Sequence, residues 1–308
     1  MIERSDVVAA GVRLAGRVRR TPVLETTVIT DRGDEVPVAL KLEYLQAGGS
    51  FKIRGSLNAL LAAENPPHEA VIASGGNAGI AAAIASKQQN VPCVVVVPTT
   101  APHAKVEALQ GLGAQVVLHG DRYADAFARA TAIATEHGAL QLHAYDLPNI
   151  VAGAGTIGLE IAEQVPECTA ILAAVGGGGL IAGIAAGTAP GVRVVGVEPT
   201  GIATLHGALA AGEPVDVSID SVAADALGAS RLGAIAMEVA RGRGIESVLV
   251  DDAAIMAARR LLWTRFRIVV EPAGATALAA IVSGTWVPGV DEYPVVVLCG
   301  ANTDPATL

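Results

Sequence analysis

The sequence of 308 residues is short of aromatic side chains, of cysteine and of positive charge. Aromatic residues make up only 3% of the chain, and 21 lysines and arginines face 30 acids, which gives a net charge of −9. A chain with this balance lacks the positive field that attracts nucleic-acid backbones or anionic membranes. We therefore expect no nucleic-acid partner and no membrane partner.

The three cysteines, Cys93, Cys168 and Cys299, are odd in number and form no CxxC pair. This pattern indicates neither a disulfide framework nor a metal site, and it fits a reducing cytoplasm. The N-terminal residues MIERSDVV are charged where a secretory signal would need an apolar run. We therefore predict a cytoplasmic protein without a structural metal.

Hydrophobic residues make up 52% of the chain and glycine occupies 35 positions, which is typical of tightly packed α/β enzymes. Short β-branched runs alternate with alanine-rich helical patterns. The predicted strands are Val38–Leu42, Ala70–Ala73, Cys93–Val97, Gln115–Leu118, Ile171–Val175, Val192–Val197 and Pro294–Leu298. The predicted helices include Ala78–Gln89, Asp121–His137 and Asp251–Phe266, the last two capped by their first aspartate. This order predicts an α/β fold with two parallel, twisted sheets covered by helices on both faces.

One uncharged stretch, Thr169–Ala189, is long enough to cross a membrane, but its interior is GGGG. Each glycine costs a helix about 1 kcal/mol, so the stretch is better explained as a buried strand, a loop and a helix. Elsewhere, the series of strands and helices over residues 56–146 predicts a small domain with its own sheet. Residues 1–55 and 147–308 would then form a larger domain.

Three glycine-containing loops directly follow predicted strands: SGGNAG (Ser74–Gly79), GGGGL (Gly176–Leu180) and CGAN (Cys299–Asn302). Ligands of parallel sheets bind at these carboxyl ends. Four glycines before a helix let backbone N–H groups surround a phosphate, and the missing GK[ST] sequence excludes a nucleotide P-loop. The loop Ser74–Gly79 suits a small carboxylate, although a plain strand-to-helix turn explains it equally well.

Lys52 lies in GGSFKIRGS, a segment with little charge. A lysine held in apolar surroundings has a lowered pKa, so its neutral amine becomes a nucleophile. An amine beside a phosphate site suggests a cofactor that carries both an aldehyde and a phosphate, which describes pyridoxal phosphate. The neighbouring Arg54 is more simply a structural residue.

The segment GAGTIG (Gly153–Gly158) matches the dinucleotide pattern GxGxxG. That pattern must follow a strand, with an acid about 20 residues later. Here DLPNIVA, which resembles a helix start, precedes it, and the next strand ends without an acid. Close packing of helices explains these glycines better than a nicotinamide-binding oxidoreductase does.

With these residues in view, the sequence resembles the fold type II pyridoxal-phosphate enzymes, and in particular the serine/threonine dehydratases. The resemblance covers almost the whole chain, with its motifs in the family order. They are RTPV, LKLEYLQAGGSFKIRG, ASGGNAGIAAA, VVPTTAPHAKV, GAQVVLHG, HAYDLPNIVAGAGTIGLEI, VGGGGLIAGIA, GVEP, EPAGATALAAI and VVLCGAN.

The resemblance implies a role for each matching position around the cofactor. Lys52 would form the internal aldimine and act as the base for the α-proton, and Phe51 would lie beside the cofactor ring. Asn77 would bind the phenolic oxygen. Cys299, where the family usually has serine, would face the pyridine nitrogen. The phosphate would be bound by Gly176, Gly177, Gly178 and Gly179.

The resemblance also implies how a substrate binds. Its carboxylate would lie in the loop formed by Ser74, Gly75, Gly76 and Asn77, and its side chain would face Tyr145. Asp146 could share that role or cap a helix. A small domain closing on the substrate would exclude water, and the family is usually dimeric, so a homodimer is expected.

The activity implied is β-elimination of a β-hydroxy amino acid, such as L-threonine or L-serine, to a 2-oxo acid and ammonia. A β-replacement synthase and a serine racemase are the alternatives within the same cofactor class. Racemases of the family usually have a serine where this chain has Gly75, which cannot exchange protons. We also expect no divalent-metal site at Glu198, because Thr204 replaces the acid of metal-binding relatives, and no isoleucine feedback, because only nine residues follow Cys299.

Overall fold

The computed structural model describes residues 2–308 and contains two β-sheets flanked by helices. The larger sheet has six strands in the order β1-β2-β10-β7-β8-β9, and the smaller sheet has four in the order β5-β4-β3-β6. The larger sheet consists of β1 (Val23–Ile29), β2 (Glu35–Lys41), β7 (Ala170–Ala174), β8 (Arg193–Pro199), β9 (Glu246–Val250) and β10 (Pro294–Val297). The smaller sheet consists of β3 (Ala70–Ala73), β4 (Cys93–Val97), β5 (Gln115–Leu118) and β6 (Leu140–Gln141). The predicted α/β class is thus confirmed.

The described residues also form helices between these strands. They are α1 (Arg4–Leu14), α2 (Lys52–Leu61), α3 (Asn77–Gln89), α4 (His103–Gly111), α5 (Tyr123–His137), α6 (Pro148–Gln164), α7 (Gly179–Gly187), α8 (Thr204–Ala211), α9 (Ala224–Leu227), α10 (Ala234–Arg243), α11 (Asp252–Leu261) and α12 (Pro272–Val282). Short 3₁₀ or π turns are η1 (Glu43–Leu45), η2 (Ala47–Gly49), η3 (Leu262–Phe266) and η4 (Pro305–Thr307). None of the helices in residues 2–308 is both long enough and apolar enough to cross a membrane.

The helices that connect the parallel strands cover both faces of the sheets, so these strands are buried on both sides. In β4, Val95 and Val97 face the hydrophobic cluster shared with α3, whereas Val94 and Val96 face the cluster shared with α5. The exception is β1, which pairs antiparallel with β2 at one edge of the larger sheet. Only Val28 of β1 is buried, and its other residues are partly or fully exposed, as fits a strand at the edge of a sheet.

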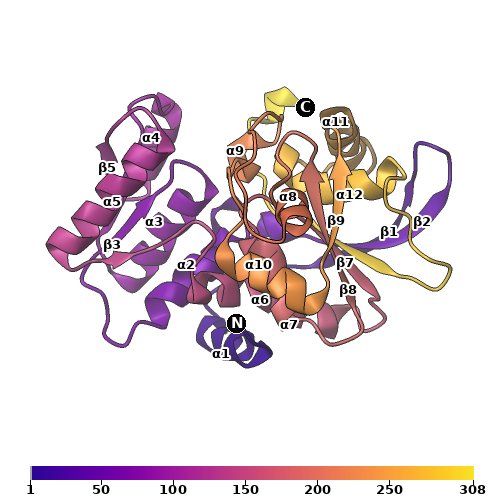
Figure 1. Cartoon of the computed structure of the whole chain (residues 1–308), viewed down its shortest axis with the longest axis horizontal. Helices are drawn as coiled ribbons and strands as arrows, with labels where there is room; N and C mark the ends of the chain where they lie inside the picture. The colour runs from indigo at the N-terminus through magenta and orange to yellow at the C-terminus, as the bar shows by residue number, and fades with distance from the viewer. Residues whose placement is uncertain (1) are drawn as a thin grey trace.

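The smaller sheet lies to one side of the larger sheet, with α3, α4 and α5 around it (Figure 1). All four of its strands fall within residues 56–146, and all six strands of the larger sheet fall outside that range. Helix α2 contacts both parts, because it packs against α3 and also against α6. The division into two domains and the mobility of the smaller one remain predictions.

The glycines of GAGTIG lie inside α6 and allow other backbones to approach closely. A Cβ at Gly155 would meet the carbonyl oxygen of Gly183 in α7 at 2.6 Å. A Cβ at Gly153 would overlap the backbone of Arg54 in α2. The segment starts within a helix and not after a strand, so the helix-packing explanation is confirmed.

Two predicted helix caps have different outcomes. The Asp251 carboxylate accepts a hydrogen bond from the N–H of Ala254 at 2.7 Å, as predicted. The prediction for Asp121 is wrong, because α5 begins two residues later and the cap comes from inside the helix. There the Asp125 carboxylate accepts from the N–H of Arg122 at 3.1 Å.

Candidate active site

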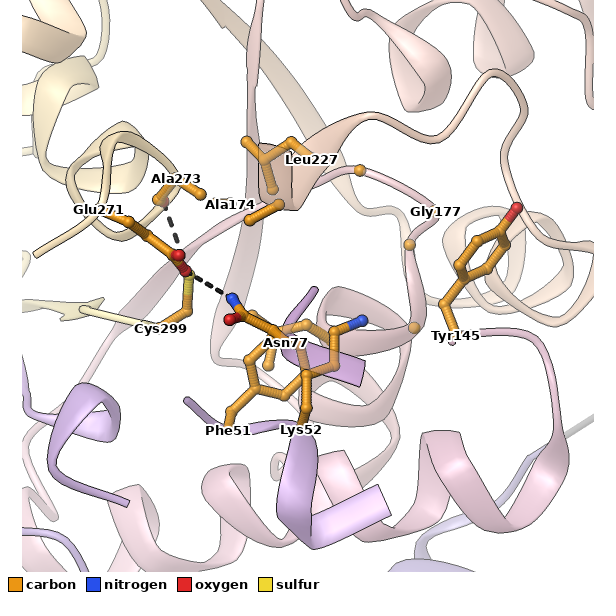
Figure 2. Close-up of a pocket in the computed structure, with 15 residues that line it drawn as sticks. Phe51, Lys52, Asn77, Tyr145, Ala174, Gly177, Leu227, Glu271, Ala273 and Cys299 are labelled. Carbon is orange, nitrogen blue, oxygen red and sulfur yellow. Dashed lines mark hydrogen bonds between the residues drawn. The ribbon is translucent and has the colours of Figure 1, made fainter. Parts of the chain in front are cut away.

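A cavity lies at the carboxyl ends of β7 and β10 (Figure 2). The cavity is lined by Phe51, Lys52, Asn77, Tyr145, Ala174, Gly176, Gly177, Gly178, Gly179, Leu180, Ala226, Leu227, Glu271, Ala273 and Cys299. Residues from distant parts of the chain therefore meet here, as the three strand-to-loop junctions predicted.

The four glycines between β7 and α7 form one wall of the cavity. A Cβ at Gly176 would meet the backbone of Leu227 at 2.8 Å, and one at Gly177 would overlap the ring of Tyr145. Gly178 has a φ of 86°, which favours glycine. No larger residue fits this loop without displacing its neighbours.

The carbonyl groups of the loop accept hydrogen bonds that hold the loop in place. The Thr204 hydroxyl donates to the carbonyl oxygen of Gly176 at 2.5 Å, and the N–H of Gly233 donates to that of Gly177 at 3.0 Å. Within residues 2–308, the N–H groups of Gly176–Gly179 have no hydrogen-bond partner. Unpaired amides at the start of α7 are suited to bind an anion such as a phosphate.

The amine of Lys52 reaches the cavity from the first residue of α2. It donates a hydrogen bond to the carbonyl oxygen of Ala144 at 2.7 Å and lies 5.0 Å from the ring centroid of Phe51. Burial lowers the pKa of Lys52 to about 8, against the opposing influence of Cys299 and Glu271. Near neutral pH the uncharged, nucleophilic share of this amine is therefore much larger than that of a solvated lysine.

The side chain of Asn77 lines the cavity and forms hydrogen bonds with two other side chains. Its Nδ2 donates to Glu271 at 2.7 Å (Figure 2). Its Oδ1 accepts from Asn302 Nδ2 at 2.7 Å. Asn302 also donates to the carbonyl oxygen of Gly48 at 2.8 Å. Asn77 therefore does not cap α3, because its side chain faces the cavity.

Glu271 is a site residue that the sequence reasoning did not single out. Its side chain is 4% exposed, and burial raises its pKa to about 7, although the hydrogen bond from Asn77 opposes this. The available signal was a single acid in the otherwise uncharged run IVVEPAGATALAAIV. A carboxylate in such a segment is either paired or functional.

Cys299 follows β10 and presents a neutral thiol to the cavity. It is 4% exposed and contacts the carbonyl oxygen of Ala273 at 3.5 Å. Burial raises the pKa of its thiol to about 12. Like the serine it would replace, this group is uncharged at neutral pH.

The predicted substrate residues are only partly in the cavity wall. Ser74, Gly75 and Gly76 form the turn between β3 and α3 but do not line the cavity with Asn77. Tyr145 does line it, with its ring against Gly177 (Figure 2). Their roles toward a substrate remain predictions.

Asp146 and Glu198 both cap helices. The carboxylate of Asp146 accepts from the N–H groups of Ala234 and Ile235 at 3.0 and 3.1 Å, at the start of α10. The buried carboxylate of Glu198 accepts from the N–H groups of residues 205 and 206 at 2.6 and 2.9 Å, at the start of α8. Glu198 thereby also positions Thr204, which supports the glycine loop.

Arg54, two residues after Lys52, is completely buried in a network of ion pairs. Its guanidinium donates to both carboxylate oxygens of Glu43 at 2.9 and 2.7 Å and to Glu160 at 2.7 Å. Lys41 donates to the other oxygen of Glu160 at 2.5 Å. This network joins α2 to η1, β2 and α6, so Arg54 is structural, as expected.

The cavity fits pyridoxal phosphate in three respects. It presents an amine of lowered pKa, a row of unpaired amides and an uncharged thiol. The fold and the site thus define an α/β enzyme with two sheets that binds pyridoxal phosphate at the ends of its strands.

Comparison with known proteins agrees with this class. Residues 14–300 match the family described as pyridoxal-phosphate dependent enzyme, and the chain belongs to that family. An L-threonine ammonia-lyase of Geobacter sulfurreducens is 36% identical over 100% of this chain and 77% of the relative. A phenylserine dehydratase of Ralstonia pickettii is 35% identical over 98% of this chain and 94% of the relative. The structure of maize serine racemase superposes with a TM-score of 0.90 at 29% identity, covering 99% of this chain and 95% of that chain.

Proposed function

We propose that this protein is an ammonia-lyase that uses pyridoxal phosphate to convert a β-hydroxy amino acid into a 2-oxo acid and ammonia. The observation that carries the proposal is the meeting of the Lys52 amine and the unpaired amides of Gly176–Gly179 in one cavity. The names of the similar dehydratases and ammonia-lyases support the same reaction class.

Pyridoxal phosphate, when bound, supplies an aldehyde that captures the substrate amine and a ring that accepts negative charge from Cα. The amides of Gly176–Gly179 would hold its phosphate, Phe51 would pack beside its ring, and Asn77 would bind its phenolic oxygen. Cys299 would face the ring nitrogen. A neutral thiol does not keep that nitrogen protonated as a carboxylate would, which favours early loss of the β-hydroxyl over a long-lived carbanion.

Lys52 would carry the proton transfer. With the substrate amine bound, the uncharged Nζ would accept the proton from Cα. The bond from Cβ to the hydroxyl would break, and the hydroxyl would leave as water after gaining a proton. Lys52 would then displace the product amine, and water would hydrolyse the released enamine to the 2-oxo acid and ammonia. The turn Ser74–Asn77 would bind the substrate carboxylate, with Tyr145 near its side chain.

Racemisation is a second candidate because maize serine racemase has the same fold at a TM-score of 0.90. Gly75 opposes it, because no side chain at this position can exchange a proton on the face opposite Lys52. We therefore expect elimination to outpace racemisation. Chiral analysis of L-serine reactions tests this, and D-serine appearing as fast as pyruvate would refute it.

A substrate panel tests the main proposal. Serine, threonine, 3-hydroxyaspartate and 3-phenylserine are incubated with the purified protein, and 2-oxo acids and ammonia are measured. At least one should give equal amounts of both products, and Lys52→Ala should lose this activity and the visible absorbance of lysine-bound cofactor. Product formation only in the presence of an added thiol or other nucleophile would instead indicate a β-replacement synthase.

We also propose that residues 56–146 close over the substrate, that the protein is a homodimer and that it works in the cytoplasm. Lys105 of α4, beside the smaller sheet, forms an ion pair with Asp225 of α9, a helix that lines the cavity. This ion pair links the smaller part of the molecule to the cavity wall. The three free cysteines are buried, which suits a reducing compartment. Small-angle scattering with and without substrate, together with light scattering for mass, tests closure and the dimer.

A further inference from the structure

The turn His143–Asp146 lies between the Lys52 amine and the glycine loop. Its Ala144 carbonyl accepts the hydrogen bond from Lys52 at 2.7 Å. Its Tyr145 ring lies against Gly177, where no Cβ fits. Its Asp146 carboxylate caps α10. The shape of this one turn therefore fixes three contacts around the cavity.

The imidazole of His143 accepts hydrogen bonds from the backbone of its own turn. Its Nδ1 lies 3.2 Å from the backbone nitrogen of Tyr145 and 2.9 Å from that of Asp146, and both N–H groups point to it. Two donors can share Nδ1 only if that nitrogen carries no proton. Turning the ring over would place a C–H group against both donors. The geometry therefore requires the neutral imidazole with its proton on Nε2.

The groups around His143 favour the neutral form. Phe127 of α5 and Tyr145 contact the imidazole edge-on, with centroid distances of 5.8 and 4.6 Å, and Tyr123 lies behind Phe127. The charged neighbours are Asp146, on the same turn, and Lys52, on α2. Burial lowers the pKa of His143 below its usual 6.5 and Lys52 lowers it further, whereas Asp146 opposes both.

We propose that His143 is a positioning residue whose neutral Nδ1 holds the turn that carries the Ala144 carbonyl, the Tyr145 ring and the Asp146 carboxylate. Protonation of His143 places an N–H against two backbone N–H groups, so the turn opens and the carbonyl partner of Lys52 moves away. The catalytic consequence rests on the proposed function of Lys52. The protonation state of the imidazole does not depend on that function, so the protonation state and the catalytic consequence can be tested separately.

Nitrogen NMR of the holoenzyme labelled with ¹⁵N-histidine tests the imidazole directly. The signal of His143 is assigned by its loss in His143→Asn. We expect the Nε2–H form at pH 8 and a midpoint of protonation below 6.5. An Nδ1–H form at pH 8, or a charged imidazole at pH 7, would overturn the proposal whatever reaction the enzyme catalyses.

Three variants test the function of the turn. In His143→Asn, Oδ1 lies as many bonds from the backbone as Nδ1 does and can accept the same two hydrogen bonds, but it does not titrate. This variant should keep most of the kcat/KM at pH 8 and lose less of it than wild type on going to pH 5.5. His143→Ala removes the acceptor and should lower kcat/KM about tenfold at every pH. His119→Asn, at an exposed histidine, is the control and should retain the wild-type pH profile.

The melting temperature gives a readout that does not depend on catalysis. Because the pKa of His143 is lower in the folded protein than in the unfolded chain, its stabilising effect is present above the unfolded pKa and lost as the pH falls. Wild type should therefore lose more stability than His143→Asn between pH 7 and pH 5. Equal pH dependence of stability and activity in wild type, His143→Asn and His143→Ala would refute the proposal.

Discussion

Burial of the Lys52 amine predicts how fast the protein captures its cofactor at different pH values. With a pKa of about 8 in place of 10.5, roughly 9% of the amine is uncharged at pH 7, compared with about 0.03% for a solvated lysine. If only the uncharged amine attacks the cofactor aldehyde, this is an advantage of about 300-fold at pH 7 from protonation alone. The advantage should shrink to almost nothing by pH 10.5.

Stopped-flow absorbance measures this rate. Protein stripped of its cofactor is mixed with pyridoxal phosphate between pH 6 and pH 10, and Nα-acetyl-lysine serves as the solvated reference. Dividing the two rates removes the titration of the cofactor itself. The protein rate should level off above pH 8, whereas the reference rate keeps rising. Lys52→Ala should show no fast phase with visible absorbance.

Glu271→Gln extends the test. The charge of Glu271 raises the pKa of Lys52, so removing that charge should move the plateau to lower pH. Glutamine can still accept the hydrogen bond from Asn77, so the cavity should keep its shape. A wild-type rate that rises about tenfold per pH unit up to pH 10 would show that the amine is solvated. The argument for a nucleophile activated by burial would then fail.

Two other substitutions probe the glycine loop and the buried network. Gly177→Ala places a methyl group in the ring of Tyr145 and should weaken cofactor binding about 100-fold. Titration with the cofactor, followed by visible absorbance, measures this affinity. An affinity equal to that of wild type would contradict the steric argument. Arg54→Leu leaves Glu43 buried without its partner and should lower the free energy of unfolding by about 3–5 kcal/mol in urea titrations. Arg20→Leu, at an exposed ion pair, should change it by less than about 0.5 kcal/mol, and an equal effect of both would refute the role of burial.

Short runs of β-branched residues made most of the parallel strands predictable. The strands Ala70–Ala73, Cys93–Val97 and Gln115–Leu118 have the predicted bounds, and those of β7 and β8 differ by one or two residues. Three strands, β1, β6 and β9, were not predicted. β1 and β9 lie at sheet edges and mix polar with apolar residues, and β6 has only two residues. Such short or half-exposed segments have no strong local pattern.

Prediction of the candidate site from the sequence was limited in the same way. The glycine loop and Lys52 were found because glycine spacing and low local charge are visible in a short window. The pair of Asn77 and Glu271 was not found, since its members are 194 residues apart in the chain. The environment of Arg54 was likewise hidden, because Glu43 and Glu160 come from different elements. Pairings of this kind appear only once the chain is folded.

Helix α2 has a consequence for protein engineering. Its first turn carries both Lys52 and Arg54, and Arg54 ties that turn rigidly to the larger sheet. The turn Ser74–Asn77, by contrast, belongs to the smaller sheet and shares none of those ion pairs. Substitutions at Ser74–Gly76 would therefore change the proposed contacts with the substrate carboxylate without disturbing these ion pairs. The sequence from Lys41 to Arg54 should stay unchanged in any variant library, because substitutions there would break the buried ion pairs and destabilise the fold.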